Sequence, residues 1–155
     1  MTAKRTLIAF WATMIIVFLP LPALALLDHC TISTVGVAFG NYNVFSPTAL
    51  TSNGSVTYSC GGIGNNSITI DLSQGNGTYA VREMRRGTEP LVYNLYLNAG
   101  ATQIWGNGTG GSQRYGPIDP PNNIDVTVTI FGRIPPGQDV TIGNYTDTIV
   151  ATVNF

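Results

Sequence analysis

The side chains of this sequence that could perform chemistry are two cysteines, one histidine and eight carboxylates. Since Cys30 and Cys60 both follow an apparent export signal, their even number predicts a disulfide in an oxidising compartment. A bond between them would close a loop of about 30 residues and add roughly 3–4 kcal/mol of stability in the chain-entropy model. Two cysteines and one histidine are too few for a tetrahedral zinc site, and their spacing matches no redox motif. We therefore predict one disulfide, no metal and no cofactor.

Catalytic motifs are missing from the sequence. His29 would lie near the end of the exported chain, where a solvated tail histidine is a better interpretation than a member of a triad. There is no nucleophile elbow, zinc-protease motif or phosphate-binding loop. The carboxylates are scattered, so a small secreted hydrolase with two catalytic acids remains only an alternative. The sequence predicts a protein that is not an enzyme.

The densest charge lies in Arg82-Glu83-Met84-Arg85-Arg86. This segment could bind an acidic partner, but a solvated loop or strand edge is the simpler interpretation.

Two aromatic residues are candidates for surface binding. Trp105, beside Gly106-Asn107-Gly108, could stack on a sugar, and Tyr115 follows it closely. The alternative is that Trp105 belongs to the core of a sandwich.

The N-terminus has the pattern of a secretory signal. Lys4 and Arg5 precede a mostly apolar segment, Leu7 to Leu21, and Ala23-Leu24-Ala25 offers small residues before a cleavage site. We predict cleavage after Ala25, which makes residues 1–25 a signal peptide and leaves residues 26–155 as one domain without a membrane span. An uncleaved anchor is the alternative.

Charge is scarce in this chain. Only 10% of residues are charged, against about 25% in ordinary soluble proteins. The predicted exported part contains no lysine, and a weakly acidic surface offers few contacts to nucleic acid or anionic lipid. Neither is an expected partner.

The exported part is predicted to consist of strands and turns. Runs rich in Val, Ile, Thr and Tyr alternate with Gly, Asn and Pro signals such as Asn53-Gly54, and no window has a helical apolar period. The expected strands are Cys30–Val37, Ser55–Cys60, Ser67–Leu72, Leu91–Leu97, Ile124–Phe131 and Tyr145–Phe155. This pattern favours an all-β fold, an antiparallel immunoglobulin-like sandwich.

The final expected strand, Tyr145–Phe155, keeps its apolar alternation to the last residue. Most chain ends fray, so this pattern predicts a C-terminal strand that is tied down. The alternative is a final strand that simply needs its last residue.

Several strings, in order, resemble the spore coat protein U domain family, which includes subunits of archaic chaperone–usher pili. The first of them follows Cys30, the second leads to Cys60, and the last is the C-terminus of the sequence. They are Phe39-Gly40-Asn41-Tyr42, Gly54-Ser55-Val56-Thr57-Tyr58-Ser59-Cys60, Leu91-Val92-Tyr93-Asn94-Leu95-Tyr96, Ile104-Trp105-Gly106-Asn107-Gly108, Phe131-Gly132-Arg133-Ile134-Pro135-Pro136-Gly137-Gln138, Gly143-Asn144-Tyr145-Thr146-Asp147-Thr148 and Val153-Asn154-Phe155.

The resemblance implies a pilin-type sandwich that lacks its last strand. In that family a periplasmic chaperone, and then a neighbouring subunit, supplies the strand, and an outer-membrane usher assembles the fibre. A missing strand leaves an unpaired edge over an apolar groove. We expect the acceptor and chaperone interface to include Tyr145, Ile149, Ala151, Val153 and Phe155.

The predicted cleavage leaves only Leu26-Leu27-Asp28-His29 before Cys30. A useful strand needs about 5–6 residues, so this chain is expected to accept a donor strand and to give one poorly. The resulting hypothesis is a secreted, non-enzymatic subunit at the end of a surface pilus. The alternatives are a stand-alone spore coat protein and an adhesin or carbohydrate-binding module.

Overall fold

The computed structural model describes residues 29–62 and 66–155, so the predicted signal peptide lies outside the described residues. These residues form strands and connecting loops without a helix. The strands are β1 (His29–Val35), β2 (Leu50–Gly61), β3 (Ile68–Leu72), β4 (Asn76–Gly77), β5 (Arg82–Arg86), β6 (Glu89–Tyr96), β7 (Tyr115–Ile118), β8 (Val126–Ile134) and β9 (Ala151–Asn154).

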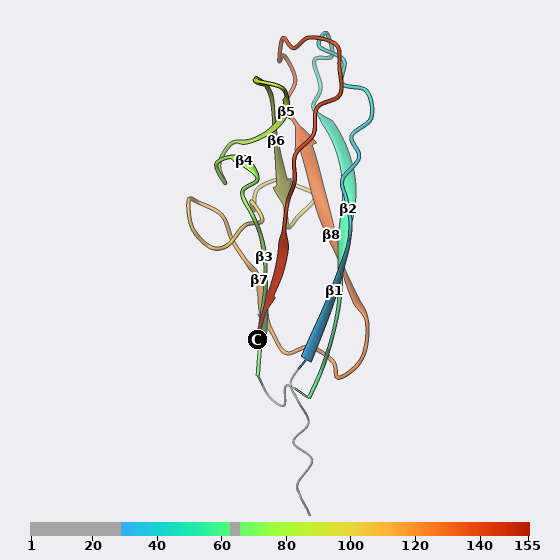
Figure 1. Ribbon diagram of the computed structural model, residues 1–155, viewed down its shortest axis with the longest axis vertical. Coiled ribbons are helices and arrows are strands. Elements are labelled where there is room, and N and C mark those ends of the chain that lie inside the picture. The colour runs from blue at the N-terminus through green and yellow to red at the C-terminus, as the bar shows by residue number, and fades with distance from the viewer. Residues whose placement is uncertain (1–28, 63–65) are drawn as a thin grey trace, which may run out of the picture.

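Two sheets face each other in an elongated sandwich (Figure 1). One has six strands in the order β1-β2-β8-β6-β5-β4, and the other has three in the order β7-β3-β9. All ladders between these strands are antiparallel. The predicted all-β, antiparallel sandwich is confirmed.

The predicted disulfide is also confirmed. Cys30 and Cys60 lie opposite each other on β1 and β2 and are bonded. Cys60 belongs to the core between the sheets, to which β2, β3, β6 and β8 contribute alternate side chains. The bond therefore fastens the edge strand β1 to the centre of the larger sheet.

One sequence expectation about turns was wrong, and the interpretation of the charged segment as a solvated loop or strand edge holds for part of it. Asn53-Gly54 is not a turn but lies inside β2, where Gly54 pairs with Ile130 of β8. A Cβ at Gly54 would lie 2.5 Å from the carbonyl oxygen of Val35, so this glycine allows the chain after β1 to pass closely over the sheet. The charged segment Arg82–Arg86 is a paired strand, β5, and its first residue is fully buried.

The expected strand Tyr145–Phe155 is shorter than predicted, because only Ala151–Asn154 pairs as β9. Before it, the main chain of Thr146 exchanges hydrogen bonds with Arg85 of β5, and the carbonyl of Val150 accepts one from the Ser73 amide after β3. The segment 145–150 thus crosses from the larger sheet to the smaller one, and it cannot pair along one strand throughout.

No helix in the described ranges is long and apolar enough to cross a membrane. Nor do those ranges bring together three or more His, Cys, Asp or Glu side chains that could hold a metal ion.

Candidate functional site

The sandwich is open along one edge. In the described part of the chain β1 pairs only with β2, and β9 pairs only with β3. These two edge strands belong to different sheets and come close to each other (Figure 1). Each has a main-chain edge that no described strand occupies, and such edges can pair with a strand from another chain.

Between these edges lies a cavity of about 410 Å³, which we call the edge groove. It has one wall from the chain at the end of β1, a second wall from the segment before β9, and a floor of core side chains. Its lining residues are Thr34, Val35, Gly36, Val37, Phe39, Leu72, Met84, Tyr93, Leu95, Ile130, Tyr145, Thr146, Asp147, Thr148, Ile149 and Ala151. The edge groove therefore brings core side chains to an accessible surface.

Of the five residues expected at a strand-accepting interface, Tyr145, Ile149 and Ala151 line the edge groove. Val153 packs against the core further along β9, outside this lining. Phe155 also lies outside it, with 56% of its surface exposed.

The wall after β1 was missing from the sequence-based interpretation. Val35, Val37 and Phe39 alternate with small residues, and this period-two pattern continues beyond the end of β1. Gly132 of β8 leaves room for this wall, because a Cβ there would lie 2.6 Å from Val37 and 2.8 Å from Phe39. The alternation of Val35, Val37 and Phe39 with small residues is the sequence signal from which this wall could have been predicted.

Asp147 fixes the second wall of the edge groove. Its carboxylate accepts hydrogen bonds from the Tyr93 hydroxyl at 2.7 Å, the Asn76 amide at 3.0 Å and the Thr148 amide at 2.8 Å. Burial, followed by the contact with Asp147, raises the pKa of Tyr93 above its ordinary range, so this hydroxyl remains a donor. The wall is held in place by the protein's own contacts.

Glu89 anchors the loop that leads into this wall. Its carboxylate accepts hydrogen bonds from the side chain and the amide of Thr141, and the Tyr145 hydroxyl donates to the Thr141 carbonyl at 3.0 Å. The hydrogen bonds from Thr141, first from its side chain and then from its amide, lower the pKa of Glu89 to about 2. The loop around Thr141 is therefore attached to the β5–β6 hairpin through the Glu89 carboxylate.

We expect this anchor to weaken in acid. Because the pKa of Glu89 is lowered in the fold, its contribution is present above the ordinary carboxyl pKa and is lost as the pH falls towards 2. The Thr141 amide resonance should report a titration with a midpoint near 2, and Glu89→Gln should abolish it. A midpoint above 4 would contradict this assignment.

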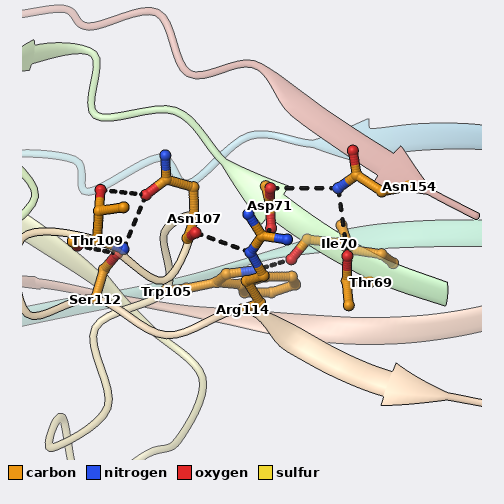
Figure 2. A network of polar contacts seen from close by, with 9 residues as sticks. All are labelled: Thr69, Ile70, Asp71, Trp105, Asn107, Thr109, Ser112, Arg114 and Asn154. Atoms are coloured by element: carbon orange, nitrogen blue, oxygen red, sulfur yellow. Dashed lines mark hydrogen bonds and ion pairs between the residues drawn. The ribbon is translucent and has the colours of Figure 1, made fainter.

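Trp105 is not a surface-binding aromatic, which corrects one sequence-based candidate. Its exposed fraction is 0%, and its indole Nε1 donates to the Ile70 carbonyl at 2.9 Å beneath β3 (Figure 2). Tyr115 is half-buried and packs against it, with ring centroids 5.9 Å apart. Both rings therefore fill the interior between the sheets.

Figure 2 also shows polar side chains beside Trp105. The Nε of Arg114 donates to the Asn107 carbonyl at 2.8 Å and lies 3.4 Å from Asp71. Asn154 of β9 donates to Asp71 and Thr69 of β3. These contacts fix loop and strand to each other and leave Trp105 no path to the surface.

The fold and the edge groove together define a class of protein: an immunoglobulin-like sandwich with an open apolar edge. The chain belongs to the Spore Coat Protein U domain family, whose model matches residues 17–152. Protein U of Myxococcus xanthus is 30% identical over 130 residues, which cover 74% of this chain and 70% of that protein. The resemblance seen in the ordered sequence strings is confirmed.

A solved structure has a similar fold. It is a chain in the CsuC–CsuE chaperone–tip adhesion subunit pre-assembly complex from the archaic chaperone–usher Csu pili of Acinetobacter baumannii. The identity is 23% and the TM-score is 0.57. The similarity covers 83% of this chain but only 40% of that one, and at this identity it shows the fold alone.

Proposed function

We propose that this protein is an exported, non-catalytic subunit of a surface pilus or coat, and that its edge groove accepts a β-strand from another chain. The observation that carries the proposal is the edge groove itself, with core side chains on its floor and the edges of β1 and β9 beside it. Edges of this kind are normally covered, charged or paired.

A strand inserted into the edge groove would gain stability in two ways. Its main chain would pair with the available edges, and its alternate side chains would enter the apolar floor between Phe39 and Ile149. A floor of Leu72, Tyr93 and Leu95 suits Val, Ile or Phe at alternate positions of the incoming strand. The intervening side chains of the inserted strand would point to solvent and can be polar.

The relatives suggest who supplies that strand. One fold relative was solved as a complex of a chaperone with a tip adhesion subunit from chaperone–usher pili. By analogy, we propose a periplasmic chaperone as the first donor, an outer-membrane usher as the assembly site and a neighbouring subunit as the final donor. Transit through the periplasm and display at the cell surface follow from these partners.

We further propose a position at a fibre end. It depends on cleavage after Ala25, which would leave a segment before Cys30 shorter than the roughly 5–6 residues of an ordinary strand. A chain of this kind accepts a strand without giving one.

A strand peptide tests both parts of the proposal. The secreted chain, with its N-terminus sequenced, is mixed with a ten-residue peptide that has Val or Ile at every second position. At a hundred-fold excess over Kd the peptide should raise Tm by roughly 10 °C. A peptide of the same composition with its apolar residues consecutive is the control. Equal shifts, or none, would refute strand acceptance, and self-polymerisation through the chain's own N-terminus would refute the fibre-end position alone.

A further inference from the structure

A second concave surface lies on the outer face of the six-stranded sheet, away from the core floor of the edge groove. It has a volume of about 390 Å³, and we call it the outer-face groove. Its lining residues are Ala49, Thr51, Asn53, Tyr96, Ala99, Gly100, Ala101, Phe131, Gly132 and Arg133. This volume is near the lower end of the about 300–1,000 Å³ that small-molecule sites occupy.

The floor of the outer-face groove is aromatic. Phe131 of β8 and Tyr96 of β6 are direct cross-strand partners. Both are flanked by buried residues, Ile130 and Leu95, so strand alternation places the two rings together on the outer face. The rings are half-buried and keep accessible surface within the groove.

Polar side chains surround this floor in register. Asn53 of β2 is the partner of Phe131, and Thr51 is the partner of Arg133 two residues along. The side chains of Thr51, Asn53 and Arg133 are exposed, and none makes a hydrogen bond or ion pair in the described part of the chain. Three polar side chains, one of them cationic, therefore border an apolar platform with their hydrogen-bonding groups open to solvent.

The third side of the outer-face groove is a rigid small-residue turn. Asn98 Oδ1 accepts hydrogen bonds from the amides of Thr102 and Gln103, both at 3.1 Å, and the Ala101 amide donates to the Asn98 carbonyl at 3.0 Å. Ala101 itself has a positive φ of 52°. The turn is held by its own hydrogen bonds, so the groove is formed in advance of any ligand.

We propose that the outer-face groove binds an acidic sugar, with a pyranose ring on Tyr96 and Phe131 and its carboxylate on Arg133. Ring faces suit the C–H face of a sugar, while Thr51 and Asn53 can bind its hydroxyls. A planar guanidinium without a carboxylate partner is suited to a ligand carboxylate. This binding is independent of strand acceptance in the edge groove.

Isothermal titration of the full secreted chain with 3′-sialyllactose, trigalacturonate and lactose tests the proposal. We expect both acidic sugars to bind at least about 10-fold more tightly than lactose, since a hydrogen bond to a charged group adds about 1.5–3 kcal/mol. Binding of one acidic sugar alone would identify which source of the carboxylate the groove prefers and would still support the proposal. Arg133→Gln should remove the advantage of the acidic sugars, and the Arg133 side chain makes no hydrogen bond or ion pair in the described part of the chain that folding would lose.

Arg85→Gln, which changes another exposed arginine, is the matched control and should keep the advantage. Tyr96→Leu should weaken the acidic sugars and lactose alike, with the fold checked by Tm. Failure of both acidic sugars to bind, equal binding of lactose, or equal losses in the Arg133 and Arg85 variants would each overturn the proposal. None of these results would affect the strand-peptide experiment.

Discussion

Replacing Ile149 by Asp is expected to abolish strand capture in the edge groove. Ile149 is half-buried and lines the second wall of that groove. The change would remove about 1.5–3 kcal/mol of apolar burial and place a carboxylate where the inserted strand excludes water. Affinity for the alternating peptide, measured by fluorescence anisotropy, should fall by more than about 100-fold.

Val150→Asp is the matched control for this prediction. Val150 is the next residue, 58% of its surface is exposed, and it does not line the edge groove. Its main-chain hydrogen bonds to Ser73 do not depend on its side chain. Peptide affinity should stay within a factor of about two or three of the unchanged chain, as surface substitutions are usually within about 0.5 kcal/mol. Equal losses in the two variants would place the inserted strand elsewhere.

The protein's own stability must be measured separately, because Ile149 also packs on the core. Ile149→Ala shortens the same side chain without introducing a charge. It should weaken the peptide by an intermediate amount while the urea midpoint of the free protein changes modestly. If peptide affinity falls only in proportion to the urea midpoint of each free variant, the loss of affinity comes from loss of folding and not from a contact in the edge groove.

The sandwich could be predicted from the sequence because its core strands alternate. In the expected strand Ser67–Leu72 the apolar residues Ile68, Ile70 and Leu72 alternate with polar ones, and all three are buried. The disulfide could be predicted from the number of cysteines. These features depend on local composition and spacing, which a sequence displays directly.

Other features depend on what packs above a residue, and the sequence does not display that. Asn53-Gly54 reads as a turn, but Gly54 is a position where the chain after β1 crosses over β2. Trp105 reads as a possible sugar platform beside flexible glycines, but β3 covers it. The outer-face groove was missed because its floor joins residues from β6 and β8 that only strand register brings together.

Arg82 is the clearest example of a residue whose surroundings could not be predicted from the sequence. It opens a segment with four charged residues, yet its side chain is fully buried. Its guanidinium donates to the Ser73 carbonyl at 2.9 Å, the Trp105 carbonyl at 2.7 Å and Asn94 Oδ1 at 2.7 Å. It also lies 5.5 Å from the ring centroid of Tyr79. Burial lowers its pKa, and main-chain carbonyls rather than a carboxylate satisfy the charge.

Replacing Arg82 by Met is accordingly expected to destabilise the fold severely. Methionine fills much of the volume but leaves the carbonyls of Ser73 and Trp105 buried without a donor, at about 1–3 kcal/mol each. Asn94 Oδ1 would lose one of its two donors and keep the Leu95 amide, so the total loss should be about 3–5 kcal/mol. Urea unfolding of Arg82→Met and Arg85→Met measures it, because Arg85 is half-exposed on the same strand and bonds only Glu83 through its side chain. The Arg85 variant should lose less than about 1 kcal/mol. If the two variants unfold at the same urea concentration, the buried guanidinium does not join β5 to the end of β3 and the Trp105 loop.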